Sequence, residues 1–94
     1  MFFKSVVFFL TKAAQYFVGY FYANGISVGR DWTEATKWYK KAAEQHNPDA
    51  TNNLGLCYEY GNGVPRNYRE AFNCYLKASV EGLSGKINVK IMWD

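Results

Sequence analysis

The sequence predicts an all-α fold, an α-α superhelix (solenoid) of two helical hairpin repeats with partial helices flanking them. Two observations lead to this prediction. The chain repeats itself at an interval of 36 residues, and each copy carries apolar residues at helical spacing between residues that begin and end helices. The 94 residues are enough for one small domain and not for two.

The internal repeat defines the organisation of the chain. Residues 14–46 align with residues 50–82 without a gap, and 11 of the 33 aligned pairs are identical. The identical pairs fall on turn glycines, helix ends and expected core positions, and they include Gly19/Gly55, Tyr22/Tyr58, Gly25/Gly61, Ala35/Ala71 and Tyr39/Tyr75. We therefore expect repeat one at 14–46 and repeat two at 50–82. Residues 1–13 are then an apolar segment, interpreted as a degenerate repeat helix, and residues 83–94 are the truncated first helix of a third repeat.

Capping residues mark the ends of the expected helices. Asn47 followed by Pro48 is typical of a helix start, and Gly61 is typical of a left-handed helix end. Both second helices open with an N-cap acceptor and a glutamate three residues later: Asp31 with Glu34, and Asn67 with Glu70. We expect Gly82 to end the second copy.

Each second helix has one apolar stripe at positions i, i+3, i+4 and i+7, which predicts a buried face. The stripes consist of Ala35, Trp38, Tyr39 and Ala42 in one copy, and Ala71, Cys74, Tyr75 and Ala78 in the other. Gly19 and Gly55 lie inside the first helices, where glycine costs about 1 kcal/mol relative to alanine. A cost that recurs at one position predicts a close approach of the paired helix, where a Cβ atom would not fit.

The combined pattern resembles the Sel-1-like repeat, a relative of the tetratricopeptide repeat. Repeat two matches it at Ala50, Leu54, Gly55, Tyr58, Gly61, Gly63, Val64, Asn67, Ala71, Lys77 and Ala78, and repeat one matches it at Ala14, Gly19, Tyr22, Gly25, Val28, Asp31, Ala35, Trp38, Lys41, Ala42 and Ala43. The departures are Val18, Ser27, Asn67 (Asn where the family has Asp), Cys74 and Ser79. The resemblance covers residues 14–82 and, weakly, 83–94.

This resemblance implies an adaptor scaffold that binds a protein or peptide and is not an enzyme. An alternative from the same family is a secreted or envelope-associated, cysteine-containing repeat protein that acts as an enzyme accessory or host-interaction factor. In tetratricopeptide-like superhelices the first helix of each hairpin lines the concave face. The positions of those helices that packing leaves free are the candidate binding residues: Tyr16, Tyr20, Asn24, Asn52, Leu56, Glu59 and Tyr60.

The residues that catalysis and metal binding need are scarce. His46 is the single histidine, and we interpret it as a surface residue at a helix end and not as a catalytic base. One histidine and two cysteines cannot form the usual four-ligand zinc site. The net charge of +3 is small for a nucleic-acid binder. The sequence therefore predicts no enzyme, cofactor, metal or nucleic-acid partner.

The first residues, MFFKSVVFFL, leave the compartment open. Their apolar run is too short to span a membrane, which needs about 20 residues. Cytoplasmic location is the first expectation, with Cys57 and Cys74 as buried thiols. If residues 1–13 act as a signal, the protein is secreted or periplasmic. The exposed repeat ends, with Phe2, Phe3, Phe8 and Phe9 at one of them, also predict self-association end to end.

Overall fold

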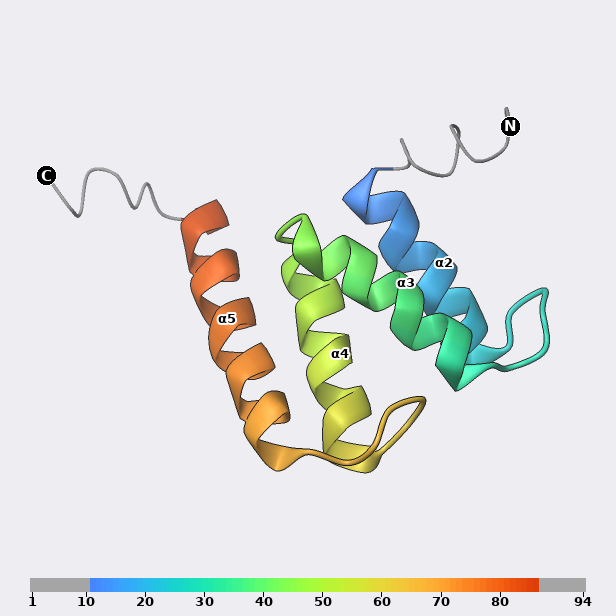
Figure 1. Ribbon diagram of the computed structural model, residues 1–94. Coiled ribbons are helices and arrows are strands. Elements are labelled where there is room, and N and C mark those ends of the chain that lie inside the picture. Colours follow the sequence, from blue (N-terminus) through green and yellow to red (C-terminus); the bar gives the residue numbers. More distant parts are fainter. Residues whose placement is uncertain (1–10, 87–94) are drawn as a thin grey trace, which may run out of the picture.

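The computed structural model describes residues 11–86, which form two helical hairpins (Figure 1). Helices α2 and α3 make the first hairpin, and α4 and α5 make the second. Their bounds are Lys12–Asn24 for α2, Trp32–Glu44 for α3, Pro48–Tyr60 for α4 and Tyr68–Lys86 for α5. No strand occurs in this part of the chain. The expected all-α fold of two stacked hairpins is confirmed, whereas the expectations for residues 1–10 and 87–94 lie outside the described residues.

The predicted caps end the helices as expected. Asn47 accepts a hydrogen bond from the backbone N–H of Ala50 at 2.9 Å, and Asp31 does the same for Glu34 at 3.0 Å. Gly61 ends α4 in the left-handed conformation at φ 71°, and Gly25 ends α2 in the same way. Thr11 caps α2 through its hydroxyl, at a position for which the sequence analysis proposed no cap.

The two hairpins repeat one another down to single side-chain contacts. Arg30 lies over the Trp32 ring at 5.8 Å, and 36 residues later Arg66 lies over the Tyr68 ring at 5.7 Å. The same holds for the turns, because the backbone N–H of Asp31 donates to the Tyr22 carbonyl and that of Asn67 donates to the Tyr58 carbonyl, both at 2.9 Å. A sequence repeat at this interval is therefore also a repeat of local geometry.

The helix-interior glycines allow the helices of each hairpin to approach closely, as predicted. A Cβ atom at Gly19 would lie 2.8 Å from the Tyr39 ring. A Cβ atom at Gly55 would lie 2.8 Å from the Tyr75 ring and 3.1 Å from the Cys74 Cβ atom. The tyrosine rings occupy the space that a methyl group would need. The second-helix stripes are correspondingly buried or half-buried, with Ala35, Tyr39, Ala42 and Ala71 the most enclosed.

A third glycine sets the junction between the hairpins. Gly63, at φ 76°, lies in the α4–α5 loop against the start of α3, and a Cβ atom there would overlap the Trp32 carbonyl oxygen and the Thr36 hydroxyl. Thr36 is 2% exposed, and its hydroxyl oxygen lies 3.3 Å from the Asn62 carbonyl oxygen. Ser27 holds the position equivalent to Gly63 in repeat one, also at positive φ (64°), and it is exposed.

Helix α5 continues beyond the expected end of the second repeat. Gly82 lies inside α5, which runs to Lys86, so the end of the repeat at Gly82 is not the end of a helix. After α3 the chain turns at Gln45 and restarts with the Asn47 cap and Pro48. The positions equivalent to Asn47 and Pro48 are Leu83 and Ser84, which lack the amide acceptor and the ring of proline. A glycine permits a helix end but does not impose one when the next helix has no start signal.

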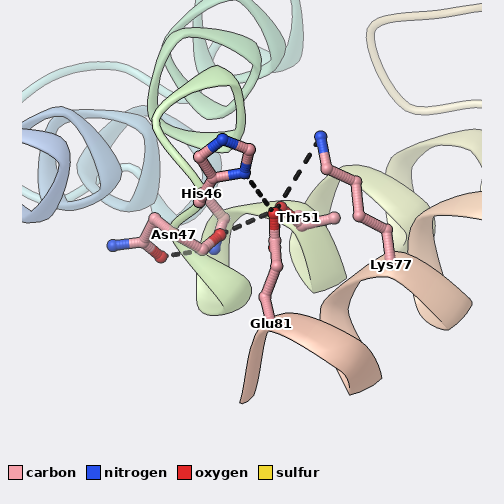
Figure 2. Close-up of polar contacts among 6 residues, drawn as sticks. His46, Asn47, Thr51, Lys77 and Glu81 are labelled. Carbon is pink, nitrogen blue, oxygen red and sulfur yellow. Dashed lines mark hydrogen bonds and ion pairs between the residues drawn. The ribbon is translucent and has the colours of Figure 1, made fainter. Parts of the chain in front are cut away.

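A buried carboxylate ties the two hairpins together near the α3–α4 turn. The Glu81 side chain is 9% exposed; it accepts a hydrogen bond from the Thr51 hydroxyl at 3.0 Å and lies 3.1 Å from His46 Nδ1 (Figure 2). The Lys77 amino group is 3.9 Å from the same carboxylate. In the first hairpin Gln45 and Gln15, at the positions of Glu81 and Thr51, are hydrogen-bonded at 2.6 Å. Both hairpins are thus closed at one end by a polar pair.

Candidate functional site

A groove of about 220 Å³ lies where α2, α3 and α4 meet, so that both repeats contribute to it. Its lining is aromatic, amide-bearing and aliphatic: Tyr20, Ala23, Asn24, Trp32, Tyr39, Asn53, Leu56, Cys57 and Asn62. None of the described residues that line it carries a charge. Because the groove needs the junction between repeats, a single hairpin would not form it.

Three of the seven predicted binding residues line this groove. Tyr20 and Asn24 reach it from α2, and Leu56 reaches it from α4. Tyr20 is 39% exposed and Leu56 is 40% exposed. Large side chains at this exposure, beside a hollow, are available to bury further area against a ligand. Tyr20 and Leu56 hold equivalent positions in the two repeats and differ in residue type, and both line the same groove.

The other four predicted residues lie elsewhere. Tyr16 is half-buried and packs against the ring of the lining residue Tyr39, with 5.9 Å between the ring centroids. Glu59 accepts a hydrogen bond from the Tyr75 hydroxyl at 2.6 Å, so its carboxylate serves the α4–α5 contact. Asn52 and Tyr60 are exposed and do not line the groove.

Ala23 and five larger residues that were not among the seven candidates also line the groove: Trp32, Tyr39, Asn53, Cys57 and Asn62. Two of them come from the second helix of repeat one and one from the loop of repeat two, whereas only first helices had been considered. One signal was available. Asn53 and Asn62 occupy the positions of Phe17 and Ile26 in repeat one, so the copies differ sharply there although the fold is the same.

Two titratable groups in the groove, Tyr39 and Cys57, are held in the neutral form. Burial raises the pKa of Tyr39 to about 12, against a smaller opposing effect of hydrogen bonding with Asn53. Burial also raises the pKa of the Cys57 thiol, while hydrogen bonding with Thr36 acts in the opposite direction. A thiol with a raised pKa is a poor nucleophile at neutral pH. Cys57 and Cys74 are both free thiols, buried and half-buried respectively.

The groove is therefore suited to binding and offers amide groups for orientation. Asn24, Asn53 and Asn62 bring side-chain amides to the lining, of which the Asn24 amide also donates to the Tyr20 carbonyl at 2.9 Å, and the aromatic rings around them provide apolar area. Sites with an apolar lining and a few polar groups of this kind are typical of ligand recognition. Among residues 11–86, no group of three or more His, Cys, Asp or Glu side chains could hold a metal ion. None of the helices in this range is long and apolar enough to span a membrane.

These features define the class of protein, an α-α superhelical repeat in which stacked hairpins create a shared groove. The Sel1 repeat family model matches residues 12–47 and 48–82, so two copies cover most of the chain. The chain belongs to the Sel1 repeat family.

Solved structures of the same family share the fold. The chain superposes on a Sel1 repeat protein from Oxalobacter formigenes with a TM-score of 0.73 and 44% identity, covering 74% of this chain and 29% of that one. It superposes on c5321, a protective antigen of uropathogenic Escherichia coli with an SLR fold, with a TM-score of 0.74 and 39% identity, covering 76% of this chain and 15% of that one. At these identities and TM-scores, the likeness extends to the sequence as well as to the arrangement of the helices.

Two curated proteins are also similar. The ERAD-associated E3 ubiquitin-protein ligase component HRD3B of Arabidopsis thaliana is 33% identical over 66 residues, which is 69% of this chain and 11% of that protein. DAP3-binding cell death enhancer 1 of Rattus norvegicus is 41% identical over 52 residues, which is 55% of this chain and 10% of that protein. The chain thus spans about a tenth of the length of these relatives.

Proposed function

We propose that this chain is a non-enzymatic protein-interaction module that holds an uncharged peptide segment of a partner in the groove between its two repeats. The observation that carries the proposal is the groove itself, which both repeats build from aromatic, aliphatic and amide side chains. The names of two relatives support it, because one is a component of a ubiquitin ligase and the other is named for binding DAP3. We describe the partner segment by the chemical groups that would fit this groove.

The lining of the groove determines what that segment offers. An apolar or aromatic side chain would fill the space beside Tyr20, Leu56 and Trp32, and backbone amides would exchange hydrogen bonds with the asparagines. A charged side chain would lose its hydration without gaining an opposite charge. Binding should therefore depend little on salt, because screening acts on charge pairs.

The test is selection of peptides from a random displayed library on the immobilised 94-residue chain, followed by titration of the selected peptide in solution. The variant Tyr20→Ala/Leu56→Ala removes two walls of the groove and should weaken binding by about 10-fold or more, because central anchors cost more than about 1 kcal/mol when truncated. The variant Ile26→Ala/Tyr60→Ala is the matched control, since it removes an exposed aliphatic and an exposed aromatic side chain outside the groove. Equal loss in both variants, or loss in neither, would count against the groove as the site.

We further propose that the protein works in the cytoplasm, where Cys57 and Cys74 stay reduced. The support is that both are free thiols with little or partial exposure and a pKa raised by burial. Titration of thiols in unfolded protein taken directly from its source should give two per chain. A value of zero would instead favour the alternative of an oxidised, secreted protein.

A further inference from the structure

The outer face of α5 carries a row of exposed large apolar side chains. Four large side chains follow one another at intervals of four residues: Tyr68 (64% exposed), Phe72 (64%), Leu76 (56%) and Val80 (58%). Residues at this spacing form a single ridge along a helix. The opposite side of α5 packs on α4, through Tyr75 against Gly55 and Glu81 against Thr51, so the ridge points away from the hairpin.

The equivalent positions of α3 are different in kind. They hold Trp32, Thr36, Lys40 and Glu44, of which Thr36 is buried beneath the next loop while Lys40 and Glu44 are exposed and charged. Leu76 and Val80 of repeat two stand where repeat one has the exposed charged residues Lys40 and Glu44. The apolar ridge on α5 is thus a property of the second repeat and not of the repeat pattern.

A further hairpin stacked like α4 on α3 does not fit this ridge. In the α3–α4 junction the loop at Gly63 lies so close to Thr36 that no Cβ atom could be added there. Phe72 stands in the place of Thr36, and its ring would fill the space of that loop. In addition, the turn that follows α3 at Gln45 has no counterpart in repeat two, because α5 continues past the equivalent residue, Glu81, to Lys86. The face therefore calls for an occupant that packs as a helix against a ridge, without a loop over Phe72.

A second copy of α5 has the required shape. Two such ridges cross in the commonest class of helix packing, where rows of i±4 residues interdigitate at about −50°. In an antiparallel pair centred near residue 74, Phe72 of each copy lies against Leu76 of the other, and Tyr68 lies against Val80. Each contact then occurs twice, with the two residues exchanged between the copies, as an isologous interface requires.

The charges on α5 allow this pairing. Glu81 is engaged with Thr51 and His46, and Lys77 lies beside Glu81. Arg69 and Glu70 remain in the first turn. In an antiparallel pair the first turns lie at opposite ends, so the two Arg69 side chains are about 15 Å apart along the axis at 1.5 Å per residue. The two Lys77 side chains are closer, about 9 Å apart along the axis by the same rise, and each lies beside Glu81 of its own chain.

We propose that the exposed ridge of α5 is a homodimer interface in which two copies of this chain pair their α5 helices antiparallel, with Phe72 against Leu76. The ridge offers roughly 400–500 Å² per copy, which puts the total near 1,000 Å², at the low end for specific interfaces. The dimer is accordingly reversible, with a dissociation constant in the micromolar range. No α5 residue lines the groove, so each dimer carries two open binding grooves.

Sedimentation equilibrium of the full 94-residue chain, from about 1 to 500 μM, tests the dimer. The expected result is a mass that rises from 10.8 kDa towards twice that value with concentration. The variant Leu76→Lys/Val80→Glu introduces the residue types that repeat one carries at these positions, which favours normal folding, and it should stay monomeric. Tyr60→Lys, which alters an exposed side chain on α4 away from the ridge, should dimerise like the unaltered chain.

A pair of complementary variants tests the antiparallel register. Phe72→Lys and Leu76→Glu should each be monomeric alone and should form a heterodimer when mixed, because only an antiparallel pair places the introduced lysine of one copy beside the introduced glutamate of the other. Far-UV circular dichroism of each variant confirms folding. If the unaltered chain stays monomeric over the whole concentration range, the proposal is overturned. That outcome includes the case in which residues 87–94 of the same chain cover the ridge. A dimer that persists in Leu76→Lys/Val80→Glu, or two variants that do not associate when mixed, overturns it as well.

Discussion

Replacing Gly63 with alanine should open the junction between the two repeats. The residue has φ 76°, in the left-handed region, and its loop lies against the first turn of α3. An added Cβ atom would meet the Trp32 carbonyl oxygen and the Thr36 hydroxyl. The carbonyl belongs to the backbone of a helix and cannot rotate away, so the loop itself has to lift from α3.

Two costs and one gain set the size of the effect. A non-glycine residue in the left-handed conformation costs about 1–2 kcal/mol, and forcing extra volume into a packed contact costs about 1–3 kcal/mol. The lower entropy of the unfolded alanine variant returns about 0.4–1 kcal/mol. The net expectation is a loss of about 2–3 kcal/mol from a total stability of about 5–15 kcal/mol.

Urea titration followed by circular dichroism, together with thermal melting, measures this loss. At about 4–8 °C per kcal/mol for a chain of this size, Tm should fall by about 10–20 °C. Gly29→Ala is the matched control, because nothing lies within 4 Å of a Cβ atom at that loop glycine and its φ is not positive. A Gly63→Ala variant as stable as Gly29→Ala would refute the reasoning that this contact fixes the junction.

Three further outcomes follow from the same geometry. Ser27→Gly should raise stability by about 0.5–1 kcal/mol, because it relieves a left-handed serine at an exposed site, and a lower Tm would contradict this. Glu81→Ala should cost about 1–2 kcal/mol by removing the buried acceptor of the Thr51 hydroxyl, which the urea midpoint reports; an unchanged midpoint would show that the contact contributes nothing. The pKa of Tyr39, raised to about 12 from 10.0, means that the fold favours the neutral phenol. The resulting stability is present below pH 10 and is lost as the pH rises from 10 towards 12. Tyr39→Phe should flatten this alkaline loss in a pH series of urea midpoints, and an unchanged slope would contradict the assignment.

Local signals in the sequence were sufficient for most of the fold. Asn47 with Pro48 begins a helix because an amide acceptor and a fixed φ act within one turn, and Gly61 ends one because it adopts φ 71° without strain. The recurrence of Gly19 and Gly55 indicated a tertiary contact, since a close neighbouring helix explains why glycine stands inside a helix that it destabilises. Such features depend on residues close together in the chain or on the repeat itself.

The features that the sequence did not reveal depend on the neighbours of a residue in space. Gly82 ends the second repeat in the sequence, but no helix start signal follows it, so α5 continues through it. Glu59 looked free, yet the Tyr75 hydroxyl from the next helix binds it. The groove draws Trp32 from a second helix and Asn62 from a loop, because it forms where hairpins meet and not along one helix.

The most direct test of the groove as the binding site is nuclear magnetic resonance of the asparagine side-chain amides during titration with the selected peptide. Asn24, Asn53 and Asn62 line the groove, whereas Asn52 and Asn73 are exposed elsewhere on α4 and α5. A peptide in the groove should shift the first three side-chain signals and leave the other two in place. Shifts confined to Asn52 or Asn73, with the groove amides unchanged at saturation, would contradict the account.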